Sequence, residues 1–67
     1  MLKLVRPSGK VKPIGATSEI FLSRIQTANI GDIADITDRE GITLNIARIN
    51  DITIENGTRT AKIIMLA

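Results

Sequence analysis

Isoleucine accounts for 13 of the 67 residues, and this excess of one β-branched side chain is the strongest constraint on the fold. A β-branched residue is restricted at χ1, which lowers its helix propensity and suits the pleated, half-buried surface of a strand. The chain has no His, Cys, Trp or Tyr, and Phe21 is its one aromatic residue. Packing must therefore rest on aliphatic side chains, and the composition predicts a mostly-β fold.

The small size of the chain indicates that its stability needs support. A single domain of about 60 residues buries only about 60% of the surface its unfolded chain exposes, and such a core rarely supplies more than roughly 3–5 kcal/mol. Without Cys there is no disulfide, and without Cys or His the usual zinc ligands are missing. We therefore expect no cofactor and no metal. We expect instead a homo-oligomer or a subunit of a larger protein assembly.

The charged residues are unevenly distributed. Residues 1–12 contain four basic side chains and no acidic one, whereas residues 13–67 contain five basic and seven acidic side chains. The basic start is not followed by the apolar run of a signal peptide, and no stretch reaches the roughly 20 apolar residues of a membrane span. We expect a soluble protein with no membrane contact, located in the cytoplasm or in a particle assembled in the cell.

The first 16 residues differ in character from the rest of the chain. They contain both prolines and two of the five glycines, interleaved with aliphatic residues. This pattern predicts an extended basic arm over residues 1–16, with a short strand at 2–6, followed by a small β-rich domain over residues 17–67. The aliphatic residues favour docking of the arm on a protein surface over neutralisation of phosphates, because phosphate-binding tails carry denser charge.

Two middle segments leave alternatives open. Residues 17–29 fit either a strand through Ile20 and Leu22 or a short helical turn. Residues 30–40 contain Ile30, Ile33 and Ile36 at a spacing of three, which fits either one helical turn or a bulged strand broken near Gly31. A polar turn at residues 38–41 then closes this unit.

The C-terminal part of the chain predicts a strand and a hairpin. Apolar and polar residues alternate over residues 42–47, as in a half-buried strand. Asn56-Gly57 is the preferred pair for a type I′ turn, which joins strands near residues 50–55 and 58–65. The apolar run at residues 63–67 needs a central position in the sheet or a partner subunit. The turn sets a register that pairs Glu55 with Thr58, Thr53 with Thr60, Asp51 with Lys62, Ile54 with Arg59, Ile52 with Ala61, and Asn50 with Ile63.

Together these segments predict a small antiparallel sheet or partial barrel of four or five strands, with at most one short helix. The chain offers little chemistry for catalysis. Its serines have no His to activate them, and it contains no glycine-rich phosphate loop. The acidic residues of segment 32–40 recur at spacings that do not match a calcium loop, and they are typical of a solvated face. We therefore expect no catalytic, cofactor or metal site, and no enzyme.

The leading functional hypothesis is a non-enzymatic structural or assembly protein. Such a small subunit would self-associate or pack on a larger assembly as a coat, cement, virion or scaffold component. Its partner-binding residues are predicted in the basic arm and the apolar C-terminal run: Lys3, Leu4, Arg6, Lys10, Lys12, Ile64 and Leu66.

The alternative hypothesis is a nucleic-acid-binding module. The strand and hairpin rhythm of residues 42–66 resembles, in outline, that of small OB and SH3-like barrels. As basic residues, Arg48, Arg59 and Lys62 would contact phosphates together with the arm. Single-strand binders of this type use aromatic stacking platforms, for which only Phe21 is present. Nucleic acid is therefore the less favoured partner.

Overall fold

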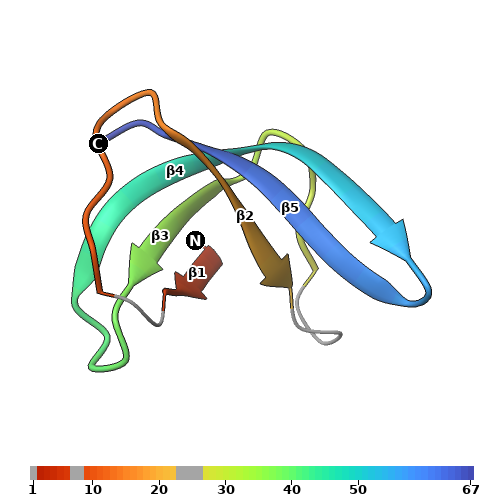
Figure 1. The fold of residues 1–67 in the computed structure, drawn as a ribbon, viewed down its shortest axis with the longest axis horizontal. Coiled ribbons are helices and arrows are strands. Elements are labelled where there is room, and N and C mark those ends of the chain that lie inside the picture. The colour runs from red at the N-terminus through yellow and green to blue at the C-terminus, as the bar shows by residue number, and fades with distance from the viewer. Residues whose placement is uncertain (1, 7–8, 23–26) are drawn as a thin grey trace.

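The computed structural model describes residues 2–6, 9–22 and 27–67, which form one curled sheet. The sheet has the order β1-β3-β4-β5-β2 and the shape of a half-barrel (Figure 1). This confirms the predicted mostly-β class. None of the described residues lies in a helix, and so none belongs to a helix that could cross a membrane. The strands are β1 (Leu2–Val5), β2 (Thr17–Leu22), β3 (Ile33–Thr37), β4 (Thr43–Glu55) and β5 (Thr58–Met65).

The sheet is antiparallel, as predicted, except at β1. This strand pairs with β3 in parallel, with Leu4 opposite Ile36. A parallel pair needs a long connection, and here the arm and β2 lie in sequence between the two strands. The predicted N-terminal arm therefore contributes a strand to the sheet. The boundary between residues 16 and 17 stays a prediction.

The structure decides between the alternatives in the middle of the chain. Residues 17–22 form a strand, and residues 23–26 lie outside the described residues. Within the segment of residues 30–40, Ile33–Thr37 form a bulged strand. Gly31 precedes it with a φ of 94°, and the register shifts between Ile36 and Thr37. The polar turn follows, with the Gly41 N–H donating to the Asp38 carbonyl at 3.1 Å.

The predicted hairpin is confirmed at its turn. Asn56 has a φ of 51° and Gly57 a φ of 77°, and the predicted register holds from Glu55–Thr58 to Asp51–Lys62. The predicted pair Asn50–Ile63 is wrong, because a β-bulge at residue 50 places Ile49 opposite Ile63. The bulge lets Ile49 turn inward and leaves Asn50 exposed.

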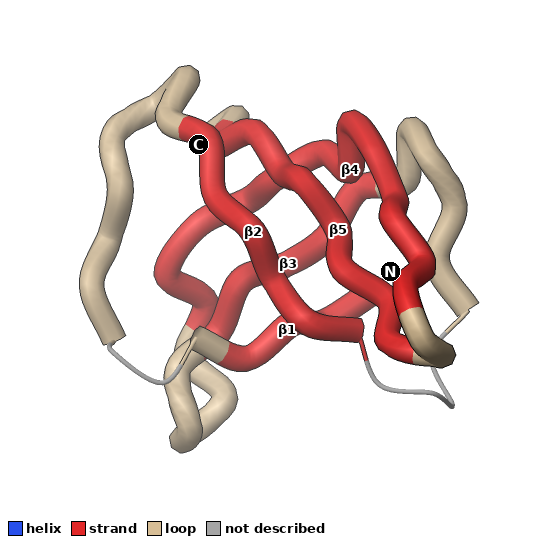
Figure 2. Tube along the Cα trace, turned by 45° about the vertical axis from the view of Figure 1, so that its right-hand side comes forward, coloured by secondary structure: helices blue, strands red, loops and turns tan. Residues whose placement is uncertain are grey.

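The core lies on the inner, concave side of the half-barrel. The curled sheet surrounds this side, as Figure 2 shows. Its largest fully buried side chains are Ile36, Ile49, Ile63 and Met65. Alanines between them are fully buried, and small residues beside large ones are how a small barrel fills its interior. Of the two alternatives for the apolar C-terminal run, the structure shows a central position in the sheet, because β5 lies between β4 and β2. The core consists of Leu4, Leu22, Ala28, Ala34, Ile36, Ala47, Ile49, Ala61, Ile63 and Met65.

Candidate assembly surface

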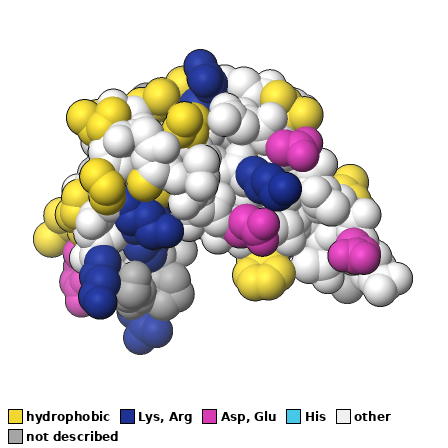
Figure 3. Space-filling view, turned by 45° about the horizontal axis from the view of Figure 1, so that its top comes forward, with side chains coloured by type: hydrophobic (Ala, Val, Ile, Leu, Met, Phe, Trp, Pro, Cys, Tyr) yellow, Lys and Arg dark blue, Asp and Glu magenta, His cyan; other side chains and the backbone are white. Residues whose placement is uncertain are grey.

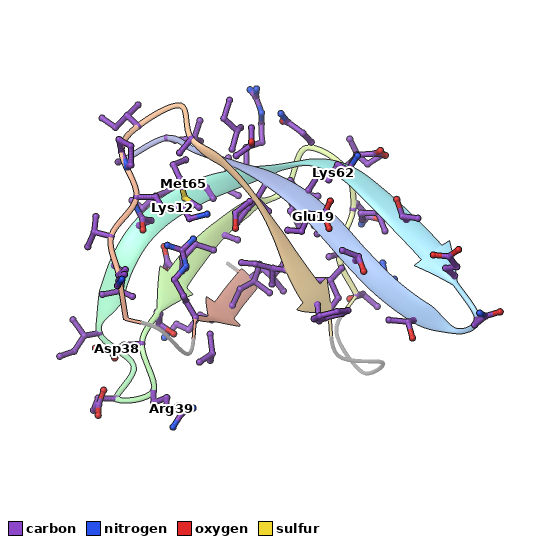
Figure 4. The ribbon with its side chains drawn as sticks, viewed as in Figure 1. Lys12, Glu19, Asp38, Arg39, Lys62 and Met65 are labelled. Atoms are coloured by element: carbon purple, nitrogen blue, oxygen red, sulfur yellow. The ribbon has the colours of Figure 1, made fainter. Side chains whose placement is uncertain are left out.

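The arm docks on its own chain. Residues 9–16 run past the end of the sheet where β4 begins and β5 ends (Figure 1). The Gly15 N–H donates to the Met65 carbonyl at 2.8 Å, and the Met65 N–H donates to the Ala16 carbonyl at 2.9 Å. These two bonds fix the direction of the arm next to β5 (Figure 4).

Asn45 is the side chain that ties the arm to β4. It is 2% exposed, and its position in β4 directs it to the inner side. Its Oδ1 accepts a hydrogen bond from the Lys12 N–H at 3.4 Å. Its Nδ2 donates to the Lys12 carbonyl at 3.0 Å and to the Ala67 oxygen at 3.3 Å. One buried amide thus joins three segments: the arm, β4 and the residues after β5.

Arg6 also binds the arm. It is 8% exposed, and its Nη1 donates to the Lys10 carbonyl at 2.7 Å. Its Nη2 is buried and has no hydrogen-bond partner in the structure. Arg6 and Leu4, which is 2% exposed, were predicted to contact a partner. Both side chains pack inside their own chain, so we leave them out of the proposed interface.

In the first half of β4, the side that is buried is not the side that the sequence pattern predicts. The alternating pattern suggests that Leu44 and Ile46 face the core, yet Asn45 and Ala47 are the buried residues. Ile46 is 37% exposed on the outer face, and Leu44 is half-buried. The more apolar side of this segment therefore faces away from the core. The outer face of an antiparallel sheet in a monomer is ordinarily polar.

Ile33, Ile64 and Leu66 share the outer face with Ile46, and the Leu66 N–H donates to the Ile46 carbonyl at 2.7 Å. Asn45 binds the arm from the inner side of the same part of β4, and the arm residues Val11 and Ile14 are exposed at this end of the sheet. Hydrophobic side chains gather on one side of this face (Figure 3). We call this group the outer patch: Val11, Ile14, Ile33, Ile46, Ile64 and Leu66, which range from half-buried to 74% exposed.

The border of the outer patch is partly basic. Lys3 lies opposite Asp35 in the β1–β3 register, and Asp35 lies opposite Ile46. Lys10 is exposed on the arm, and the Lys12 Nζ donates to the Ser18 Oγ at 3.2 Å. Of the residues predicted for partner binding, Lys3, Lys10, Ile64 and Leu66 thus lie in or around one surface. Lys12 turns toward β2.

A charged row occupies another part of the outer face. Lys62 on β5 lies opposite Glu19 on β2 and opposite Asp51 on β4 (Figure 4). Opposite charges at facing positions of neighbouring strands attract each other. A shallow hollow of about 490 Å³ next to this row is lined by Thr17, Ser18, Glu19, Asn50, Asp51, Lys62 and Ile63.

The three residues predicted for nucleic-acid contact do not form one basic surface, because Arg48 and Lys62 lie on the outer face and Arg59 does not. Arg48 is exposed on the outer face, where its Nε donates to the Asn50 Oδ1 at 3.2 Å. Lys62 lies between two acids. Arg59 is half-buried among inward-facing positions, and its Nη2 donates to the Ala28 carbonyl at 2.9 Å. Their charges therefore do not add up to one basic face.

The acidic residues of segment 32–40 are separated along β3 and its flanking turns. The Asp32 Oδ2 accepts the Asn29 N–H at 2.9 Å, before the strand. The Asp38 Oδ1 accepts the N–H groups of Glu40 and Ile42, after the strand. Across the described ranges, no three acidic side chains come together to hold a metal ion. Two of these carboxylates instead cap turns.

Sequence reasoning missed the role of Asn45. The available observation was a polar amide in a strand of alternating apolar and polar residues. Such a pattern predicts that the amide faces solvent, and only the curl of the sheet shows that it is buried. Comparison with known proteins adds no relative, since no family model, curated protein or solved structure matches this chain. The geometry of the outer patch therefore carries the functional argument.

Proposed function

We propose that this protein is a non-enzymatic structural subunit that associates with further copies of itself through the outer patch. The observation that supports this most directly is the reversed exposure of β4. Ile46 faces solvent while Asn45 takes the buried place. Exposed apolar side chains that gather on one part of a small chain are typical of a protein contact site.

The size of the molecule is compatible with this role. A standard interface buries about 800 Å² on each partner, which is less than a fifth of the 4490 Å² surface of this chain. Apolar burial contributes about 25 cal/mol per Å², whereas exposed ion pairs at the basic border add only about 0–1 kcal/mol each. Association should therefore rest on the aliphatic side chains and should weaken only modestly in high salt.

Sedimentation velocity between 1 and 100 µM tests the proposal. The wild-type chain should form a concentration-dependent oligomer, and Ile46→Lys or Leu66→Lys should weaken it at least tenfold. Ile54→Lys is the matched control, because Ile54 is 67% exposed near the hairpin turn, outside the patch. A wild-type chain that stays monomeric at 100 µM would contradict the proposal.

The same samples test the nucleic-acid alternative. A complex with 6–10 phosphate contacts loses about 10³–10⁵ in affinity between 50 and 200 mM salt. Titration with single-stranded and duplex oligonucleotides at both salt concentrations should show no such binding. A steep salt dependence together with a monomeric protein would favour the alternative.

A further inference from the structure

We infer that the free edge of β2 pairs with β2 of a second copy, so that two half-barrels join in one continuous antiparallel sheet. This inference rests on the proposed self-association and names a specific contact for it. It uses the edge of the sheet, whereas the outer patch uses its face. Edge-to-edge pairing forms backbone hydrogen bonds and therefore fixes a register, which contact between apolar faces does not.

The two edges of the sheet differ in how they are protected. Edge strands avoid pairing with other chains by being short and by carrying Lys, Pro or a bulge. β1 has four residues, contains Lys3, and is followed directly by Arg6. β2 has six residues, pairs with β5 without a shift in register, and contains no Lys, Arg or Pro; its one charged residue, Glu19, lies opposite Lys62 of β5. Of the two edges, β2 is therefore the one that can accept a strand.

The backbone of β2 has unused hydrogen-bonding capacity on its outer edge. The described structure shows backbone bonds from residues 17–22 to β5 and to no other segment. In a regular strand, every second residue directs its N–H and C=O away from its neighbour. Such groups are strong donors and acceptors, and an added strand satisfies them in a row.

A second copy satisfies these groups in a favourable register. Two antiparallel strands related by a two-fold axis perpendicular to the sheet must place residues from the same face opposite each other. With Ile20 on the axis, Glu19 lies opposite Phe21 of the second copy and Ser18 lies opposite Leu22. A shift that places Glu19 on the axis sets two like charges opposite each other, which is destabilising.

Phe21 gives this register a side-chain contact. It is the only aromatic residue, and it is 78% exposed on the outer face of β2. In the register centred on Ile20, the two Phe21 rings are diagonal neighbours at about 7–8 Å, within reach of aromatic side chains. The two outer faces also lie on the same side of the joined sheet, so the outer patches of both copies form parts of one surface.

Cysteine cross-linking tests this pairing cleanly because the chain has no Cys of its own. Glu19→Cys and Phe21→Cys are mixed, with one of them isotope-labelled, and oxidised at 50 µM. The mixed disulfide should form at least tenfold faster than either self-linked product. Glu55→Cys, at the far end of the hairpin, is the matched control. Mixed with Phe21→Cys, it should form the mixed disulfide no faster than two proteins that meet by random collision.

A second variant separates the edge from the face. Phe21→Lys changes an exposed side chain, so the fold should be kept, as circular dichroism can verify. It should weaken dimer formation at least tenfold in sedimentation. Equal rates for all disulfides, together with an oligomer that Phe21→Lys leaves unchanged, would overturn the edge pairing and leave the proposed function standing. A wild-type monomer at 100 µM would overturn both.

Discussion

Replacing Asn45 with alanine should release the arm from the sheet. The Asn45 side chain makes three hydrogen bonds, two to the backbone of Lys12 and one to the Ala67 oxygen. Alanine removes all three and leaves these backbone groups without their partner. Because the arm carries Val11 and Ile14, its release also breaks up the outer patch.

The expected cost follows from these three bonds. Each hydrogen bond contributes a net of about 0.5–1.5 kcal/mol, so Asn45→Ala should cost about 1.5–3 kcal/mol, given that two of the bonds are long. The cost falls in the lower part of the range for three bonds, because the backbone groups of a released arm can form hydrogen bonds with water instead. A domain of this length has a total stability of about 3–10 kcal/mol, so this loss is a large share of it.

Urea unfolding and amide hydrogen exchange measure the effect. The Gly15 and Met65 N–H groups, which join the arm to β5, should exchange about 10- to 150-fold faster, since each 1.4 kcal/mol is a factor of ten. Asn50→Ala is the matched control, because Asn50 is exposed and accepts a single bond, from Arg48. If the two variants differ by less than about 0.5 kcal/mol, the reasoning is refuted, since ordinary surface substitutions fall within that range.

Two further substitutions test the turn and the core. Gly57→Val should lower the free energy of unfolding by about 1–2 kcal/mol and the melting temperature by roughly 4–16 °C, because Gly57 has a φ of 77° while open space surrounds its Cβ position. Gly57→Asn should cost much less, and equal melting temperatures for the two variants would argue against backbone strain as the cause. Ile36→Ala, at a fully buried position, should cost about 2–5 kcal/mol in urea unfolding. Ile42→Ala, at a 63% exposed position, should stay within about 0.5 kcal/mol, and similar losses at both sites would show that the core is placed wrongly.

Local patterns predicted the hairpin because its determinants are local. Asn56 and Gly57 tolerate a positive φ, and Thr alternates with Ile before the turn and with Arg and Ala after it, which sets the register near the turn. The same reasoning failed at Asn50, because the position of a β-bulge depends on the curvature of the whole sheet and not on the residues beside it. Of the two places expected for the apolar C-terminal run, a central strand or a partner subunit, the structure shows the central strand.

The candidate site was less accessible to sequence reasoning. The arm residues Val11 and Ile14 were marked as docking elements by their aliphatic character, and the exposed Leu66 by its place in the apolar run. Arg6 and Leu4 appeared equally suitable for a partner, yet they serve the arm and the core of their own chain. Neither charge nor hydropathy distinguishes a contact within one chain from a contact between chains.

The β-rich class and the turn at residues 56–57 follow from the amino-acid sequence, because propensity and alternation act over a few residues, whereas the sequence leaves the last strand with two possible places. Only the tertiary structure decided which side of β4 is buried. Asn45 and Ala47 lie on the inner side, where the Asn45 amide bonds the backbone of Lys12 and the Ala67 oxygen. Ile46 lies between them in the strand and is therefore left on the outer face, where it forms part of the patch proposed for assembly.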